Sequence, residues 1–186
     1  MKKKVIFFTK DPPVDKKAIH IWLGKATLSH EQHLCQILKQ YLGASPINLA
    51  TTPKGKLYLP NSFLHFNLSD SEEWLAIALS WEAPVGVDIE KLRPVEDMEQ
   101  MIADYFSLKE QAYVYPEKPI SEEETLCRFW EIWNRKEACF KALGLGIQDG
   151  MNRWDCAGDD WVFVNEVWVR SLPIKHCLSA AIAIHL

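Results

Sequence analysis

The sequence lacks the patterns that mark a disulfide framework, a zinc ribbon or a membrane span. Its five cysteines are odd in number and none forms a C-x-x-C pair, a usage that fits a reducing cytoplasm. The apolar run near the N-terminus, residues 5–8, is too short for a signal peptide, and no stretch approaches the roughly 18 apolar residues of a membrane helix. We therefore expect a cytoplasmic protein with no membrane partner.

An excess of positive charge is also missing. The chain has 21 Lys and Arg against 25 Asp and Glu, for a net charge of −4, so we expect no nucleic-acid partner. It contains neither a Walker-type G-x-x-x-x-G-K-[ST] loop nor a G-x-G-x-x-G motif before a helix. Any anionic ligand must then be held locally, by a metal ion or by a few placed lysines.

What the chain does contain is a full set of strand and helix patterns. With 186 residues, 48% of them hydrophobic, it is long enough for one sizeable core or two small halves. Period-two and helical spacings predict strands at 5–8, 18–23, 63–68, 74–81, 85–90, 161–170 and 176–184, and helices at 29–42, 95–103, 107–114 and 121–143. The strands at 74–81 and 176–184 are both alanine-rich, which indicates either an internal duplication or two unrelated buried strands of similar composition.

Two carboxylates share one face of the strand at 85–90. Alternate residues of a strand point the same way, so Asp88 and Glu90 stand side by side. Unpaired, they would raise each other's pKa, so they need either a cation between them or solvent around them. Both interpretations stay open on this pattern alone.

The helix predicted at 121–143 directs a carboxylate and an amine toward the core. Its apolar stripe includes Trp133 and Phe140, with Arg135 on the opposite side; Glu137 falls on the stripe and Lys141 follows one turn later. Charged residues occupy such positions when they are paired or bind a ligand. A simple salt bridge between Glu137 and Lys141 at the edge of the stripe is the alternative.

If this helix packs on the strand at 85–90, three carboxylates converge. Asp88, Glu90 and Glu137 would then lie together, with Lys136 and Lys141 near them. Oxygen-only ligands in that number suit Mg2+, which completes its shell with water and substrate phosphates.

These residues form a recognisable pair of motifs. G-V-D-I-E at 86–90 and W-N-R-K-E-A-C-F-K at 133–141 resemble the paired motifs of the 4'-phosphopantetheinyl transferase family, G-[VI]-D-[IV]-E and W-x-x-K-E-[AS]-x-x-K. Gly55-Lys56 and the run F-N-L-S-D-S at 66–71 resemble the family's G-K-P and F-N-x-S-H-S. The resemblance covers residues 55–146, and the length is similar to that of the larger monomeric type made of two halves.

The resemblance implies transfer of the 4'-phosphopantetheine arm of coenzyme A to a serine of an apo acyl or peptidyl carrier protein, as in fatty acid, polyketide or nonribosomal peptide biosynthesis. It makes Asp88, Glu90 and Glu137 the Mg2+ ligands, with Glu137 also the base for the carrier serine. Lys141 would hold the pyrophosphate, and Lys136 would support the same charge. The leaving product would be 3',5'-ADP.

The same resemblance extends to the coenzyme A contacts. It assigns Lys56 and Ser69 to the phosphates of coenzyme A, and it gives Glu110 a family position without a clear role. Asp70 stands where the family has a histidine beside the 3'-phosphate, so it would either repel that phosphate or turn away and cap the turn after the strand at 63–68. Cys35 falls near a common arginine position.

The implied fold is α+β: two similar α/β halves related by a pseudo-twofold axis, with antiparallel sheets packed against helices. Residues 1–84 would form the half that contacts coenzyme A, and residues 85–186 the half with the metal site and the carrier-protein surface. We expect a monomeric holo-[acyl-carrier-protein] synthase type of enzyme. A non-catalytic homologue that only binds carrier protein and an unrelated Mg2+-dependent phosphohydrolase are the alternatives.

Overall fold

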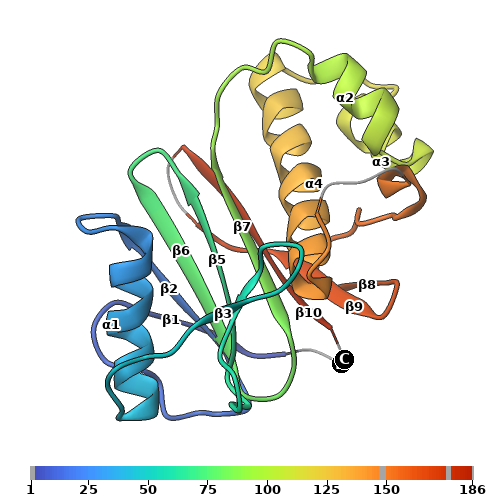
Figure 1. Ribbon diagram of the computed structural model, residues 1–186. Helices are drawn as coiled ribbons and strands as arrows, with labels where there is room; N and C mark the ends of the chain where they lie inside the picture. The colour runs from blue at the N-terminus through green and yellow to red at the C-terminus, as the bar shows by residue number, and fades with distance from the viewer. Residues whose placement is uncertain (1–2, 147–149, 175–176, 186) are drawn as a thin grey trace.

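The computed structural model describes residues 3–146, 150–174 and 177–185, and its N-terminal part is a four-stranded sheet with one helix on its outer face (Figure 1). Across the sheet the strands are β1 (Val5–Phe8), β2 (Ile19–Lys25), β6 (Trp74–Ser80) and β5 (His65–Ser71). β1 and β2 run parallel, and the other neighbours are antiparallel. The apolar face of helix α1 (His30–Leu42) packs on β5 and β6.

The C-terminal part repeats this plan. Its sheet has the order β7 (Val85–Lys91), β10 (Leu178–His185), β9 (Val167–Ser171) and β8 (Val162–Val164), and all its neighbours are antiparallel. Helix α4 (Glu122–Leu143) lies along its outer face, and α2 (Met98–Tyr105) and α3 (Leu108–Val114) pack on the first half of α4. The expected α+β fold of two similar halves is confirmed, whereas the boundary at residue 84 stays a prediction.

One core fills the space between the two sheets. On β6, Ala76 and Ala78 face this core, while the alternate residues Leu75, Ile77 and Leu79 pack against α1. β7 and β10 contribute Val87, Ile89 and Ile182 from the other side. The period-two alternation of these strands therefore separates a face shared by the two sheets from a face covered by a helix.

Side-chain caps fix the helix ends where the sequence predicts them. Ser29 and Ser107 form capping boxes with the residues three positions on, and Ser121 accepts a hydrogen bond from the backbone N–H of Glu124. Gly144 ends α4 with a φ of 70°, a left-handed conformation that glycine adopts without strain. No helix in the described part of the chain is both long enough and apolar enough to cross a membrane.

Two strand predictions need correction. The single strand expected at 161–170 is a hairpin, because Asn165 and Glu166 adopt φ values of 46° and 66° and reverse the chain between β8 and β9. No strand is predicted between the helix at 29–42 and residue 60, but this segment contains the short hairpin β3 (Ala50–Thr51) and β4 (Leu57–Tyr58). β10 begins at Leu178, and the expected start at residue 176 lies outside the described residues.

Side chains join the two sheets where their edge strands meet. On β5, the polar atoms of Asn67, Ser69 and Ser71 accept hydrogen bonds from the backbone N–H groups of Val87, Ile89 and Lys91 on β7, at 2.9, 3.4 and 3.0 Å. Consecutive bonds are two residues apart on both strands, as they are between neighbouring strands of a sheet. Here, however, the acceptors are side chains of β5 and not its backbone carbonyls. We call this contact between β5 and β7 the seam; it satisfies backbone donors that would otherwise be buried without partners.

Helix α4 approaches β7 closely at one glycine. A Cβ built on Gly86 would lie 2.1 Å from the carbonyl oxygen of Ala138 and 2.3 Å from the backbone nitrogen of Ala142. Only a residue without a side chain fits there, since both obstacles are backbone atoms of a helix. This contact brings the C-terminal half of α4 against the strand that carries Asp88.

The close contact predicts that Gly86→Ala separates α4 from β7 and destabilises the fold by about 1–3 kcal/mol or more. The free energy of unfolding in urea measures the effect. Gly146→Ala is the matched control, because a Cβ there meets nothing within 4 Å and should change stability by less than about 0.5 kcal/mol. Equal stability of the two variants would show that the helix can shift without cost.

Candidate active site

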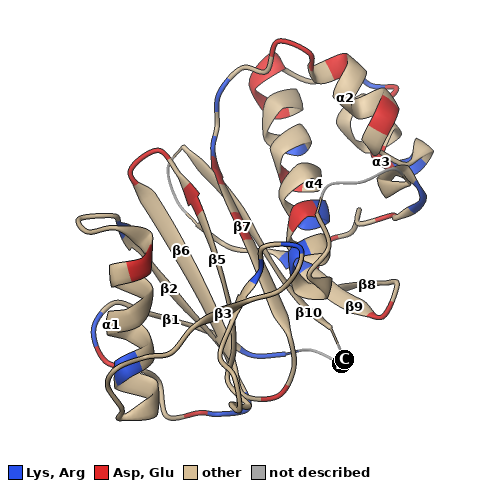
Figure 2. Cartoon of the chain, in the orientation of Figure 1, with Lys and Arg blue, Asp and Glu red and all other residues tan. Residues whose placement is uncertain are grey.

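The predicted site residues surround a cavity between β5, β7 and α4. This cavity, of about 360 Å³, is lined by Leu68, Ser69, Asp70, Asp88, Glu90, Trp133, Glu137 and Lys141. Figure 2 shows the acidic segment of β7 beside a stretch of α4 that carries both signs of charge. The structure therefore brings together the residues predicted for the metal and pyrophosphate, with the exception of Lys136.

Lys141 is the cation at the centre of this cavity. Its ammonium lies 2.6 Å from Oδ1 of Asp88 and donates to Oγ of Ser69 at 2.9 Å. Ser69 in turn donates to the same oxygen of Asp88 at 2.9 Å. Burial raises the pKa of Asp88, although the Lys141 charge and these hydrogen bonds act in the opposite direction. The alternative interpretation of this helix, a simple salt bridge between Glu137 and Lys141, is replaced by a contact of Lys141 with Asp88 on β7.

Glu90 also accepts a hydrogen bond from a serine of β5. Ser71 donates to Oε2 of Glu90 at 2.8 Å, just as Ser69 donates to Asp88 two residues earlier. Burial raises the pKa of Glu90, the Ser71 hydrogen bond lowers it, and the neighbouring Asp88 charge raises it. The two seam serines thus orient the two carboxylates of β7, so Asp88 and Glu90 do not form a freely solvated strand face.

Glu137 is the third carboxylate of this cavity. Burial first, and then the Asp88 charge, raise its pKa to about 7, while Lys141 lowers it. Its Oε1 and the Oδ2 of Asp88 are buried and have no hydrogen-bond partner among the described residues. A carboxyl group that titrates near neutral pH can accept a proton from a bound hydroxyl group.

The donor set fits Mg2+ in its chemistry. It consists of carboxylate oxygens, and a cation would satisfy the two partnerless oxygens of Asp88 and Glu137. In the present side-chain positions no group of three acidic, histidine or cysteine residues in the described ranges is gathered closely enough to hold a metal ion. The ammonium of Lys141 neutralises Asp88 instead.

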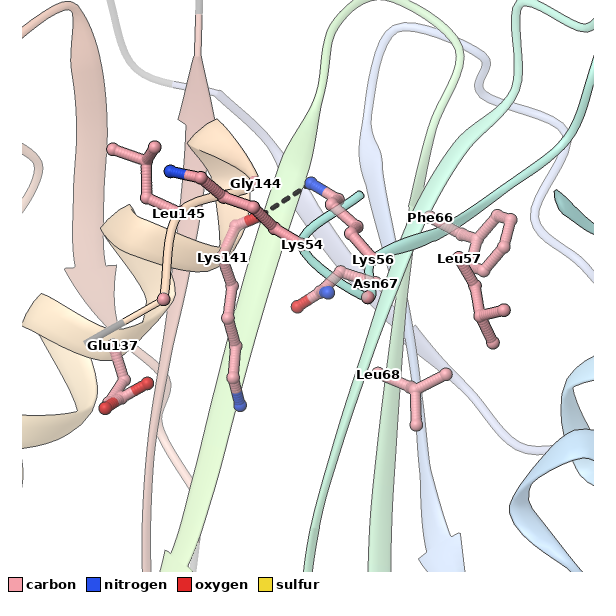
Figure 3. Close-up of a pocket in the computed structure, with 12 residues that line it drawn as sticks. Lys54, Lys56, Leu57, Phe66, Asn67, Leu68, Glu137, Lys141, Gly144 and Leu145 are labelled. Atoms are coloured by element: carbon pink, nitrogen blue, oxygen red, sulfur yellow. Dashed lines mark hydrogen bonds between the residues drawn. The ribbon is translucent and has the colours of Figure 1, made fainter. Parts of the chain in front are cut away.

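A second cavity lies next to the first, toward the β3–β4 hairpin, and Figure 3 draws the residues that line it. Its volume is about 370 Å³, and Glu137 and Lys141 line both cavities. The hairpin contributes Lys54 and Lys56, and the end of α4 contributes Gly144 and its neighbours. Burial lowers the pKa of Lys56 to about 8. The two cavities therefore present lysines at separate points, as an extended ligand with several negative charges requires.

Lys136 does not reach either cavity. Its side chain is fully buried, lies 2.7 Å from Oε2 of Glu110 on α3, and donates to the carbonyls of Met151 and Trp154 at 2.9 and 2.6 Å. Lys136 and Glu137 are adjacent on a helix, so their side chains leave it about 100° apart. The expectation that Lys136 supports the pyrophosphate charge is therefore not met; this lysine and Glu110 tie α3 and the 151–156 segment to α4.

Arg135 also differs from its prediction. Expected on the solvent side of α4, it is buried and donates to the carbonyls of Cys156 and Gly158 and to Ser171. The long helix is covered by the chain that returns after it, which a helical periodicity cannot show.

Asp70 lies at the rim of the first cavity, within β5, and does not cap a turn. Nδ1 of His30, the first residue of α1, stands 3.5 Å from its Oδ1. The sequence assigns no site role to His30 or Ser71. The alternation of polar residues in F-N-L-S-D-S was a usable indication for Ser71, whereas His30 comes near the site only through the fold.

Fold and cavities together define an α+β protein with carboxylates and lysines gathered where its two sheets meet, an arrangement suited to phosphoryl transfer. A comparison with known families specifies this class further. The model of the 4'-phosphopantetheinyl transferase superfamily matches residues 84–178, and the chain belongs to this family.

Several relatives carry the name of this family. The 4'-phosphopantetheinyl transferase AcpT of Salmonella typhimurium is 44% identical over 81 residues, which make up 44% of this chain and 41% of the relative. AcpT of Escherichia coli (strain K12) is 34% identical over 159 residues, 84% of this chain and 68% of the relative. HetI of Nostoc is 32% identical over 120 residues, or 61% and 49%. The chain thus matches less than half the length of the Salmonella relative.

The buried pair predicts a large effect of removing its cation. Lys136→Met leaves the Glu110 carboxylate buried without a counter-charge and should lower the free energy of unfolding by about 3–5 kcal/mol in urea titrations. Adding Glu110→Gln to this variant should recover part of the loss. Lys109→Met is the control, since its exposed pair with Asp155 should contribute under about 1 kcal/mol. A Lys136→Met effect no larger than the control would contradict the structural role.

The raised pKa of Glu137 predicts a pH-dependent stability. Between its ordinary value of 4.5 and about 7, the folded protein holds this proton more tightly than the unfolded chain, so stability falls as pH rises through that window. Glu137→Gln removes the loss. In buffer with a chelator and no coenzyme A, the melting temperature of Glu137→Gln minus that of the parent should increase from pH 5 to pH 8. Glu124→Gln, at the exposed start of α4, should show a constant difference.

Proposed function

We propose that the protein transfers the 4'-phosphopantetheine arm of coenzyme A to a serine of an apo acyl or peptidyl carrier protein and releases 3',5'-ADP. The single observation that carries this proposal is the meeting of Glu137, Lys141 and Asp88 in one cavity, which shares Glu137 and Lys141 with a second cavity lined by Lys54 and Lys56. Family membership and the names of the relatives support it. The protein would act as a cytoplasmic monomer.

The chemistry needs a base and a cation from the chain. The carrier serine attacks a phosphorus of the coenzyme A pyrophosphate, a new P–O bond forms, and the bond to the leaving 3',5'-ADP breaks. Glu137 takes the serine proton, and its pKa of about 7 keeps a large fraction ionised at neutral pH. The ammonium of Lys141 neutralises charge on the pyrophosphate, a contact for which it would leave Asp88.

Mg2+ bound by Asp88, Glu90 and Glu137 would neutralise the pyrophosphate and stabilise the leaving oxygen. The protein prepares this site by holding two of the three carboxylates with Ser69 and Ser71. The Lys141 ammonium offsets their mutual repulsion until a ligand arrives. Both features support a site in which Mg2+ would replace the Lys141 ammonium as the cation beside Asp88.

The test is mass spectrometry of an apo carrier protein incubated with the protein, coenzyme A and Mg2+. A gain of the phosphopantetheine mass is expected, and Glu137→Gln should reduce its rate at least about 100-fold by removing the base. Glu124→Gln on the same helix should keep the parent rate. A carrier protein that binds without gaining mass would indicate the non-catalytic homologue, and release of inorganic phosphate from simple esters would indicate the phosphohydrolase.

A further inference from the structure

Two lysines reach the second cavity from one tight hairpin, and they differ in what they contact. Lys54 and Lys56 flank Gly55, whose φ of 86° turns the chain between β3 and β4. The hairpin closes on itself through hydrogen bonds from the Thr52 N–H to the Lys56 carbonyl at 2.8 Å and from the Gly55 N–H to the Thr52 carbonyl at 2.9 Å. Beyond these bonds, β3 and β4 pair over only two residues each, so the hairpin depends on contacts with its surroundings.

The ammonium of Lys56 is fully used by backbone carbonyls. It donates to the carbonyl oxygens of Lys141 at 2.5 Å, Ala142 at 3.1 Å and Val85 at 3.4 Å, and Figure 3 shows the first of these bonds. An ammonium has three donors, so none is left for a ligand. Two of the acceptors belong to the last turn of α4, where the carbonyl oxygens carry the negative end of the helix dipole and attract a cation.

This contact fixes the backbone from which Lys141 extends. The carbonyl that accepts from Lys56 belongs to the same residue whose ammonium reaches Asp88. The stem of Lys56 runs along the helix end, since a Cβ placed on Gly144 would lie 3.5 Å from its Cδ. Lys56 therefore joins the hairpin, the start of β7 and the end of α4 at one point.

Lys54 has the opposite character. Its side chain is exposed, lines the cavity, and has no hydrogen bond or ion pair with any described residue. In Figure 3 its ammonium projects past the end of α4, beside Leu145 and away from Lys56. It is a cation at the cavity wall that can bind an anion without giving up an existing contact.

We propose that the two lysines divide the work: Lys54 binds a phosphate group of the substrate, and Lys56 is a positioning residue that clamps the hairpin to α4 and so places Lys141. The first half of this proposal rests on the proposed function, because it requires coenzyme A or a similar phosphate-bearing ligand. The second half concerns the ligand-free protein. It revises the expectation that Lys56 itself contacts the phosphates.

The clamp is tested without any ligand by backbone hydrogen exchange in Lys56→Met, with Lys54→Met as the matched control. Losing three charged hydrogen bonds should speed exchange of the Gly55 and Leu145 amides by about tenfold or more. Lys54→Met should exchange like the parent. Lys56→Arg keeps several donors and should restore most of the protection of these amides from exchange. This variant therefore distinguishes loss of the contact from general unfolding.

Phosphate binding is tested by calorimetry with coenzyme A at several salt concentrations. Lys54→Met should weaken binding several-fold and flatten its salt dependence, because a direct charge contact is lost. Lys56→Met should keep the salt dependence of the parent. In the mass-spectrometric transfer assay Lys56→Met should mainly lower kcat, whereas Lys54→Met should mainly raise KM for coenzyme A.

The outcomes separate the two halves of the proposal. Unchanged amide exchange in Lys56→Met, together with a flattened salt dependence, would make Lys56 the phosphate ligand and overturn the clamp. An unchanged affinity in Lys54→Met overturns the role of Lys54. A parent that binds no coenzyme A overturns the proposed function and the role of Lys54 with it, while the exchange result still decides whether Lys56 is a clamp.

Discussion

The site depends on how two sheet edges are joined. β5 and β7 are edge strands that would each expose unpaired backbone groups, and the seam pairs them through side chains of alternate residues on β5. Each seam serine has a second bond, to the carboxylate of the residue before its backbone partner. One interaction therefore sets the register of the two sheets and orients Asp88 and Glu90.

Helix α4 completes the site because a glycine lets it approach β7. At Gly86 the helix backbone lies where any side chain would stand, and this brings Glu137 and Lys141 over the carboxylates of β7. The result is a buried group of acids with one ammonium among them, which is why burial raises the pKa of Asp88, Glu90 and Glu137. The carboxylates of such a group repel one another until a bound ligand changes the charge in the cavity.

Neighbouring charged residues of one motif have different roles. Lys136 faces inward to Glu110 and holds the fold, while Glu137 faces the cavity and carries the proposed chemistry. Lys54 and Lys56 show the same division on the hairpin, one free and one engaged by carbonyls. On the hairpin the residue type is the same, and only the direction of the side chain separates the structural lysine from the one proposed to bind phosphate.

The sequence by itself determined most of the elements and the acidic core of the site. Helical spacing placed α1 and α4, strand alternation put Asp88 and Glu90 on one face, and Glu137 on an apolar stripe indicated a buried functional acid. These are local properties, because the side-chain period of a helix or strand depends on neighbouring residues.

The tertiary structure alone decided which charged groups meet. It turned Lys136 away from the site, buried Arg135 beneath the returning chain, and placed Lys56 on the end of α4. Each of these depends on a backbone carbonyl or a counter-charge that comes from a distant part of the chain. No periodicity along a single element can reveal such a partner, since it is the packing of elements that supplies it.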